Sequence, residues 1–194
     1  MAGWTTHEGE AVVLYRRDVD TDQLIPARFM SASRAEGYGR FLLHDLREDD
    51  ADFPLDRHPG ASVLVAGPNF GCGSSREAAV YALVDAGIRV VVAESFADIF
   101  AGNAVNNGLL PVATPEAAAL RAAIGQGAAP ARVDLASRRL SVAGQELNFA
   151  LSETAQAKLM NGWDDIDLTR AHAGDIRNFR DRRKADHAWA WPSA

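Results

Sequence analysis

The segment from residue 62 to residue 93 limits the possible folds more than any other part of the chain. It contains an apolar stretch, SVLVAG (62–67), a loop rich in glycine and serine, a helical pattern, EAAVYALVDA (77–86), and a second apolar stretch, IRVVVA (88–93). Gly87 ends the helical pattern, and the second stretch is apolar on both faces, as in a central strand. This order predicts a βαβ unit whose loop lies at the carboxyl edge of a parallel sheet, where ligands bind.

Other apolar and capping patterns add elements on both sides of this unit. A strand is expected at residues 12–15, and residues 133–135 and 140–142 alternate across a short turn as the strands of a hairpin do. Ser152 provides an N-cap for a helix that should end at Asn161-Gly162. Since 194 residues suit one domain with its own core, we expect a single folding unit. Three more elements are expected, namely a helix that begins at Thr114-Pro115, a strand at 146–149 and a last helix within 170–184.

Charge and composition limit the partners of the chain. The net charge is −6, the apolar content is 47% and the charged content is 24%, and these values are ordinary for a globular protein. An acidic chain is poorly suited to neutralise a phosphate backbone, so nucleic acid is not expected as a partner. The N-terminus MAGWTTHEGE lacks a basic region followed by an apolar one, and no stretch approaches the ~18 apolar residues of a membrane span. We therefore expect a cytoplasmic protein without a membrane partner.

Cys72 is the only cysteine of the chain. A disulfide within the chain is therefore excluded. One thiolate also cannot hold a structural zinc ion or an iron-sulfur cluster by itself, because these take roughly three or four ligands of this kind. We expect no metal-ligating residue in this chain, and any such metal must be held elsewhere.

The loop NFGCGSSRE (69–77) permits four interpretations. Ser74 and Glu77 have the S-x-x-E spacing of a capping box, which would make the loop simply the start of a helix. A dinucleotide-binding loop fits less well, because Arg76 stands where a third glycine would let helix and strand approach closely. A Walker A loop, which belongs to the same nucleotide-binding interpretation, fails as well because no Gly-Lys-Ser/Thr follows. Cys72 could act as a nucleophile only with a paired histidine, which the sequence does not place there.

The fourth interpretation is a carboxylate-binding site. The backbone N–H groups around Gly71 and Gly73 are unhindered, the start of a helix carries partial positive charge, and Arg76 offers a planar fork that matches a carboxylate. The same donors would stabilise an ionised serine, whose hydroxyl is otherwise too weak an acid to serve as a base. Local spacing alone leaves both the capping box and the carboxylate site open.

Two further polar segments flank this loop in the chain. DVDTDQLIP places carboxylates at the alternate positions 18, 20 and 22, but Gln23 and Phe29 stand where a calcium-binding EF-hand loop needs glycine and glutamate. In an extended segment the three acids would share one face, either as a solvated edge or toward a cleft. The second segment, SFADIFAGNAVNNGLLP (95–111), follows a predicted strand, and turn formation alone explains its glycines and amides.

Four motifs, taken together and in order, resemble those of the small subunits of bacterial 3-isopropylmalate dehydratases, which belong to the aconitase superfamily. They are DVDTDQLIPARFM, GPNFGCGSSRE, SFADIFAGNAVNNGLLPV and MNGWDDIDLT, and the similarity covers about residues 10–180. The resemblance implies an α/β fold of the aconitase swivelling type, with a mixed sheet flanked by helices. It also implies a single swivel domain over residues 1–194, with a helical C-terminal tail at about 152–194.

The resemblance implies a two-subunit enzyme as well. In this family a 4Fe-4S cluster is held by three cysteines of the separate large subunit, so that subunit is expected as a partner and no cofactor is expected in this chain. The implied activity is that of a hydro-lyase of leucine biosynthesis, which isomerises 2-isopropylmalate and 3-isopropylmalate by dehydration and rehydration. The alternatives are a related hydro-lyase acting on homoaconitate, citraconate or a dimethylmaleate, and a non-catalytic carboxylate-binding module.

Four residues of this chain match functional residues of the family. Ser74 matches the serine whose alkoxide takes the proton next to a carboxylate, and Asp22 matches an active-site aspartate that orients the site, so both are expected to be catalytic. Ser75 matches a serine that contacts substrate, and Arg76 matches the arginine that clamps its carboxylate. Family members usually continue SSRE with histidine, whereas Ala78 follows here, so a hydrogen bond behind the site should be missing.

Overall fold

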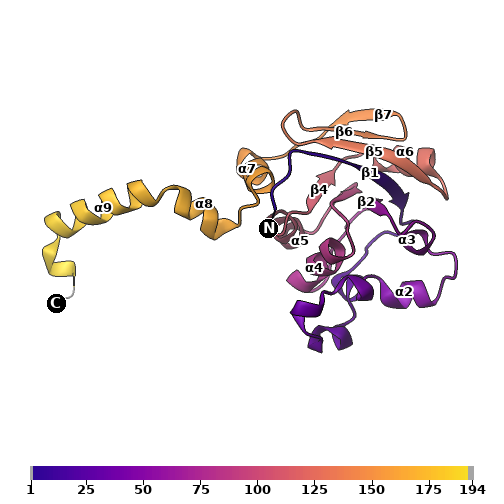
Figure 1. Cartoon of the computed structure of the whole chain (residues 1–194), viewed down its shortest axis with the longest axis horizontal. Helices are drawn as coiled ribbons and strands as arrows, with labels where there is room; N and C mark the ends of the chain where they lie inside the picture. The colour runs from indigo at the N-terminus through magenta and orange to yellow at the C-terminus, as the bar shows by residue number, and fades with distance from the viewer. Residues whose placement is uncertain (1, 192–194) are drawn as a thin grey trace.

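The computed structural model describes residues 2–191, so that residues 1 and 192–194 of the expected domain lie outside the described part. Its centre is a sheet of seven strands in the order β4-β3-β2-β1-β5-β6-β7 (Figure 1). Neighbouring strands from β4 to β1 are parallel, and those from β1 to β7 are antiparallel. The strands are β1 (Thr6–Val13), β2 (Ala61–Val65), β3 (Val90–Ala93), β4 (Leu110–Ala113), β5 (Ala128–Asp134), β6 (Arg139–Val142) and β7 (Gln145–Asn148).

The helices follow the strands in chain order and cover both faces of the sheet. The α-helices are α1 (Thr21–Leu24), α2 (His44–Glu48), α3 (Pro54–Arg57), α4 (Glu77–Asp85), α5 (Asp98–Asn106), α6 (Ala117–Ile124), α7 (Glu153–Asn161), α8 (Asp165–Ala171) and α9 (Ala173–Asp186). Short 3-10 segments occur at Ala27–Ser31, Arg34–Glu36, Gly39–Phe41 and Ala188–Ala190. The expected mixed sheet with flanking helices is thus confirmed, and β2, α4 and β3 form the predicted βαβ unit.

Alternation of side chains along the strands divides the core into two clusters, one on each face of the sheet. In β1, Val12 belongs to one cluster, whereas Ala11 and Val13 belong to the other. Leu83 of α4 is buried in the first cluster and Leu120 of α6 in the second. Burial of each such leucine stabilises the fold by about 1.5–3 kcal/mol, so helices on both faces hold the sheet in place.

Local sequence signals predict some ends of helices correctly and others wrongly. The hydroxyl of Ser152 accepts a hydrogen bond from the Ala155 N–H at 3.1 Å, so this residue is the N-cap of α7 as predicted. The expected helix start at Thr114-Pro115 is wrong, because α6 begins at Ala117. The Thr114 hydroxyl instead pairs with the side chain of Glu116, and this contact forms a turn before the helix.

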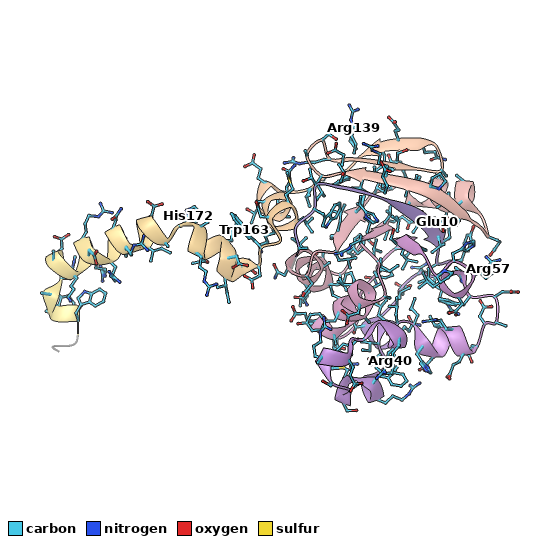
Figure 2. The ribbon with its side chains drawn as sticks, in the orientation of Figure 1. Glu10, Arg40, Arg57, Arg139, Trp163 and His172 are labelled. Carbon is cyan, nitrogen blue, oxygen red and sulfur yellow. The ribbon has the colours of Figure 1, made fainter. Side chains whose placement is uncertain are left out.

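The C-terminal helices α8 and α9 extend away from the rest of the molecule as an arm (Figure 1). Figure 2 shows Trp163 where this arm leaves the body and His172 between its two helices. The buried Lys158 of α7 pairs with Asp165 at the first position of α8, and Asn106 of α5 donates to the same carboxylate at 3.1 Å. Side-chain contacts therefore join the base of the arm to the body. Within residues 2–191, no helix is both long and apolar enough to cross a membrane.

Candidate active site

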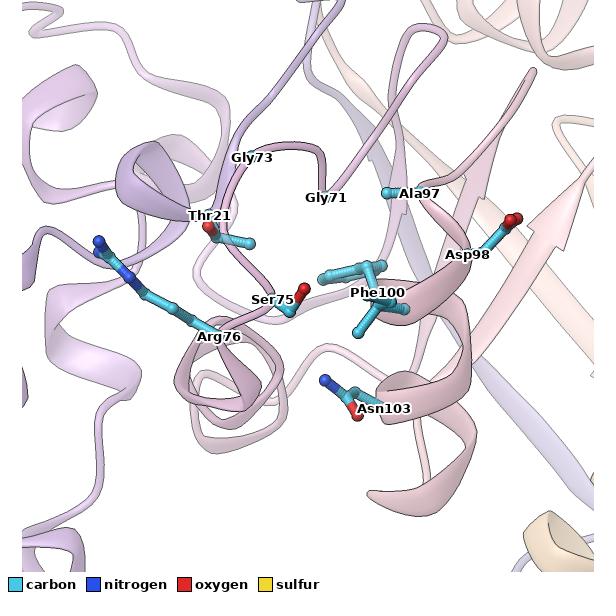
Figure 3. Close-up of a pocket in the computed structure, with 10 residues that line it drawn as sticks. Thr21, Gly71, Gly73, Ser75, Arg76, Ala97, Asp98, Phe100 and Asn103 are labelled. Atoms are coloured by element: carbon cyan, nitrogen blue, oxygen red, sulfur yellow. The ribbon is translucent and has the colours of Figure 1, made fainter.

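A cavity of about 250 Å³ lies between the loop that follows β2 and the start of α5, which follows β3 (Figure 3). Both segments leave the carboxyl ends of parallel strands, which is the edge where the βαβ pattern predicts a ligand site. The α5 side of the cavity combines the apolar Ala97, Ile99 and Phe100 with two polar residues, Asp98 and Asn103. The lining residues are Thr21, Gly71, Gly73, Ser75, Arg76, Ala97, Asp98, Ile99, Phe100 and Asn103.

The glycine-serine loop is held by backbone hydrogen bonds to segments that are distant in the chain. The Gly71 N–H donates to the carbonyl of Val19 at 2.8 Å, and the Thr21 N–H donates to the carbonyl of Cys72 at 2.9 Å. The φ angles of 76° at Gly71 and 88° at Gly73 lie in the left-handed region, which glycine adopts at little cost. These two glycines therefore let the loop turn beside the residues that precede α1.

The capping-box interpretation of Ser74 and Glu77 is wrong. The N-cap residue of α4 is Arg76, and its side chain makes no capping hydrogen bond. The Ser74 hydroxyl lies 3.1 Å from the Thr21 hydroxyl instead, and Glu77 accepts a hydrogen bond from Asn107 at 2.8 Å. Long-range partners have thus taken both side chains away from the helix start, which leaves its first N–H groups open to a ligand.

Consecutive backbone donors near the cavity are unused. In the described part of the chain, the N–H groups of Gly73, Ser74 and Ser75 meet no protein acceptor. These N–H groups lie just before Arg76, the N-cap residue of α4, and they favour an anion because their partial positive charges add to that of the helix start. The geometry therefore fits the carboxylate interpretation of this loop better than the capping interpretation.

The extended arrangement considered for the acids at positions 18, 20 and 22 is also wrong, because each acid has a different local structure. Asp20 caps α1, and its side chain accepts from the Gln23 N–H at 2.7 Å, while Gln23 accepts in return from the Asp20 N–H at 3.0 Å. A capping box is therefore present, but it begins a different helix from the one expected. Asp18 accepts hydrogen bonds from Asn69 and Arg17, which lower the pKa of its carboxyl group.

The four residues carried over from the family lie at one place in the fold, although only two of them line the cavity. Ser75 and Arg76 are lining residues, while Ser74 and Asp22 lie beside the cavity. The guanidinium group of Arg76 forms an ion pair with Asp22, and Figure 3 shows this arginine extending away from the α5 side of the cavity. The structure thus joins residues 54 positions apart in the chain into one polar group. Ala78 packs against the buried core beside α4.

Sequence reasoning missed Thr21 and the residues of α5. No local pattern distinguishes Thr21, and turn formation alone explains the polar residues of the SFADIF segment. A signal was nevertheless present, because α5 follows β3 just as α4 follows β2. Loops after adjacent parallel strands meet at the same edge of a sheet, so Ala97 and Asn103 could have been placed beside the glycine-serine loop from the strand order.

Cys72 does not have the environment of a nucleophile. Burial raises the pKa of its thiol, and the carboxylates of Asp20 and Asp18 raise it further. Its thiol makes no hydrogen bond to any histidine among residues 2–191, so the partner that a nucleophilic cysteine needs is missing from the described part.

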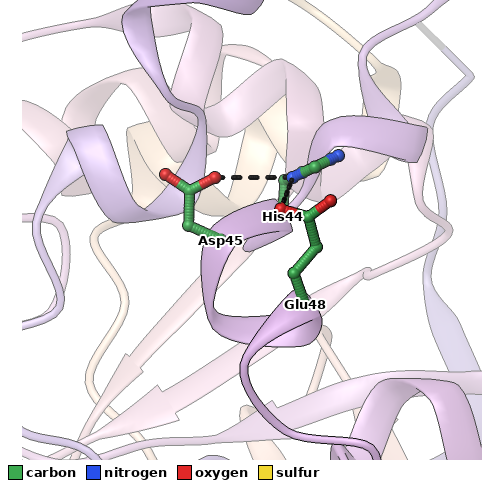
Figure 4. A group of neighbouring side chains, drawn as sticks. All are labelled: His44, Asp45 and Glu48. Carbon is green, nitrogen blue, oxygen red and sulfur yellow. Dashed lines mark ion pairs between the residues drawn. The ribbon is translucent and has the colours of Figure 1, made fainter.

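A second polar group, formed by His44, Asp45 and Glu48, lies on α2 and is exposed for the most part (Figure 4). The Nδ1 atom of His44 is 3.4 Å from an oxygen of each carboxylate. Arg28 already binds both oxygens of Asp45, and this bond lowers the pKa of that carboxyl group. Asp45 is thus already paired with Arg28, and exposed acidic groups are common without a metal, so we assign no metal to this group.

The mixed sheet, with a glycine-serine loop and an arginine at its carboxyl edge, defines a domain of the aconitase class. The family model for the aconitase C-terminal domain matches residues 1–117 of this chain. The 3-isopropylmalate dehydratase small subunit of Shewanella baltica is 48% identical over 193 residues, which cover 92% of this chain and 96% of the relative. The same-named subunit of a Parafrankia species is 46% identical over 187 residues, 94% of this chain and 96% of the relative.

A solved structure extends the likeness to the whole fold. The crystal structure of 3-isopropylmalate dehydratase from Methanocaldococcus jannaschii matches with a TM-score of 0.69 and 28% sequence identity, over 89% of this chain and 99% of that one. The chain belongs to the family of 3-isopropylmalate dehydratase small subunits. The expected fold class and the family resemblance are both confirmed by these matches.

Proposed function

We propose that this chain is the small subunit of a 3-isopropylmalate dehydratase, a hydro-lyase that works only together with a large subunit. It would interconvert 2-isopropylmalate and 3-isopropylmalate through 2-isopropylmaleate in leucine biosynthesis. The observation that carries the proposal for this site is the row of unpaired N–H groups beside Arg76, because these donors suit a substrate with carboxylate groups. The names of the relatives support the choice of substrate.

Arg76 and Ser75 would bind one carboxylate of the substrate. Both residues line the cavity, and a guanidinium group can donate two parallel hydrogen bonds to a carboxylate. In the free chain the partner of Arg76 is Asp22. Asp22 would therefore orient the guanidinium group, and a substrate carboxylate would compete with it or share the arginine. This is the positioning task that we assign to Asp22.

Ser74 would act as the base. In the dehydration, the Ser74 alkoxide takes the proton from the carbon next to a carboxylate, and the electrons of that C–H bond form the new C=C bond. The C–OH bond at the neighbouring carbon breaks, and the hydroxyl leaves with the electron pair of that bond as hydroxide, which takes a proton from solvent and becomes water. In the rehydration, water returns that proton to solvent and adds as hydroxide to the other carbon of the double bond, while Ser74 gives its proton to the carbon that first carried the hydroxyl, which restores the alkoxide. Unpaired N–H groups of the loop would stabilise the alkoxide before it takes the proton.

The iron-sulfur cluster is assigned to the large subunit. This chain has a single cysteine, which cannot supply the roughly three or four thiolate ligands that such a cluster needs. When bound, an iron of the 4Fe-4S cluster would supply a Lewis acid for the departing hydroxyl. We further propose that residues 1–194 form one swivel domain with the helical tail at about 152–194, and that the assembled enzyme is cytoplasmic.

The test uses the chain reconstituted with its large subunit. Ser74→Ala should lower kcat about 10²- to 10⁴-fold, because a positioned base contributes roughly this much to a proton transfer. Ser141→Ala is the matched control, since Ser141 lies on β6 and does not line the cavity, and it should leave kcat unchanged. Unchanged turnover in Ser74→Ala would remove the base role. A higher kcat/KM for homoaconitate, citraconate or a dimethylmaleate would assign the chain to a related hydro-lyase.

A further inference from the structure

Thr21 makes two hydrogen-bond contacts with the proposed base. Its hydroxyl oxygen, Oγ1, lies 2.7 Å from the backbone carbonyl oxygen of Ser74 and 3.1 Å from the Ser74 hydroxyl oxygen. The residue is only 1% exposed, although it lines the cavity. The Thr21 N–H donates to the carbonyl of Cys72, and the Thr21 carbonyl accepts from the N–H of Ile25. The backbone of Thr21 is therefore fixed between the loop and α1. The hydroxyl is therefore held where it touches both polar groups of Ser74.

The direction of these hydrogen bonds follows from counting protons. A threonine hydroxyl has one proton, and a carbonyl oxygen can only accept, so the short contact with the Ser74 carbonyl requires Thr21 as the donor. Towards the Ser74 hydroxyl, Thr21 can then only accept. The proton of the Ser74 hydroxyl is consequently directed at Thr21 as long as Ser74 is neutral.

We infer that Thr21 is a positioning residue for Ser74, and that its hydroxyl reverses its hydrogen bond when Ser74 loses its proton. The Ser74 alkoxide can only accept, and Thr21 can reach it by turning its O–H bond without moving its oxygen, because the two oxygens are already 3.1 Å apart. The Ser74 carbonyl would not be left unpaired, since it also accepts from the Arg76 N–H at 2.7 Å. The hydrogen bond gained has an ionised acceptor and is stronger than the one given up.

This inference rests on the proposed function, because it needs Ser74 to act as the base. A purely structural role for Thr21 is the competing explanation, since the residue is buried at the first position of α1. Two substitutions separate these explanations. Thr21→Val keeps the shape of the side chain and removes the hydroxyl, whereas Thr21→Ser keeps the hydroxyl and removes the methyl group.

The experiment measures kcat, KM and the pH dependence of kcat for the chain reconstituted with its large subunit. We expect Thr21→Val to lower kcat about 10- to 100-fold, with KM within about twofold of the wild type, because only the alkoxide loses a donor. In Thr21→Val, kcat should continue to rise with pH up to a higher pH than in the wild type. Thr21→Ser should keep the wild-type kcat and pH profile. Asp22 and Arg76 are present in every variant, so the hydroxyl alone accounts for a shift.

Thr21→Ser and Thr21→Ala provide a second comparison if the valine variant does not fold. Both lack the methyl group and share any packing defect, but only serine keeps the hydroxyl. Equal kcat values for these two variants, or a wild-type profile for Thr21→Val, would overturn the inference. Ser74→Ala is measured alongside. If it is inactive while the Thr21 variants are normal, the proposed function stands and the role of Thr21 falls, whereas an active Ser74→Ala refutes the base itself.

Discussion

The α-carbon of Gly71 lies against the ring of Phe100, so closely that a Cβ atom on Gly71 would sit 2.1 Å from Cγ of the ring. Phe100 belongs to α5, while Gly71 belongs to the loop after β2. The ring also packs edge-on against Phe70, with the two ring centroids 5.4 Å apart. The absence of a side chain at position 71 therefore lets the two segments that border the cavity pack directly on each other.

We expect Gly71→Ala to destabilise the chain by about 3 kcal/mol or more, because backbone strain at φ = 76° adds to the clash with Phe100. Two other glycines separate these causes. Gly87 has φ = 91° but open space around its α-carbon, so Gly87→Ala should cost only about 1–2 kcal/mol. Gly60 has open space and no positive φ, so its alanine variant should be nearly neutral. Urea unfolding measures all three, and equal losses at positions 71 and 87 would contradict the packing argument.

The sequence predicts most of the fold but only part of the site, and the difference lies in the distance between interacting residues. The βαβ unit rests on periodicity and on Gly87, which act within a few residues of each other. The pairing of Ser74 with Thr21 joins residues 53 positions apart, and no local pattern indicates it. The capping-box spacing of Ser74 and Glu77 therefore does not produce a capping box, because tertiary hydrogen bonds replace the local ones.

Arg76→Lys should lower kcat/KM about 10- to 100-fold in the reconstituted enzyme, because lysine keeps the charge but loses the planar fork that binds a carboxylate. Arg47→Lys is the control, since Arg47 pairs with Asp56 as Arg76 pairs with Asp22 but does not line the cavity. Wild-type kinetics for Arg76→Lys would remove this arginine from the substrate site.

Asp22→Asn tests whether this aspartate acts through Arg76. The substitution keeps the shape of the side chain and removes the charge that holds the guanidinium group. We expect kcat/KM to fall, and we expect the effect to be much smaller when Arg76 is already lysine, because residues that act as one unit do not give additive effects. A double-mutant cycle on kcat/KM measures this, and fully additive losses would show that Asp22 acts independently of Arg76.

Cys72 should react slowly with iodoacetamide in the folded chain. Its pKa is raised by burial and by the charges of Asp20 and Asp18, and only the thiolate is nucleophilic. The same residue in urea-unfolded chain is the control, and no other cysteine contributes. Asp20→Asn should speed the reaction at pH 8, because asparagine keeps the N-cap of α1 but removes a negative charge. A folded rate equal to the unfolded rate would contradict this environment.

The ion pair of Glu94 and Arg121 should make stability depend on pH. Arg121 donates two hydrogen bonds to Glu94, at 2.8 Å and 2.6 Å, and a third at 2.6 Å to the carbonyl of Ala66, where the chain enters the glycine-serine loop. The two side chains are 24% and 17% exposed. The bonds from Arg121 lower the pKa of Glu94 below 4.5. A carboxyl group whose pKa is lowered by folding stabilises the fold at pH values above its pKa in the unfolded chain. This stabilisation is lost as the pH falls through its pKa in the folded chain.

Glu94→Gln should therefore lower the free energy of unfolding by about 1–2 kcal/mol at pH 7, since this removes a charged acceptor that is mostly shielded from water. The difference from the wild type should shrink as the pH falls below about 4.5, where Glu94 of the unfolded chain takes up a proton, and it should be lost as the pH falls through the lower pKa of the folded carboxyl group. Glu8→Gln is the matched control, because the pair of Glu8 with Arg132 is largely exposed and should contribute little at either pH. Urea unfolding at pH 7 and pH 3 measures both variants, and a loss in Glu94→Gln that does not change with pH would rule out the ionised pair as its cause.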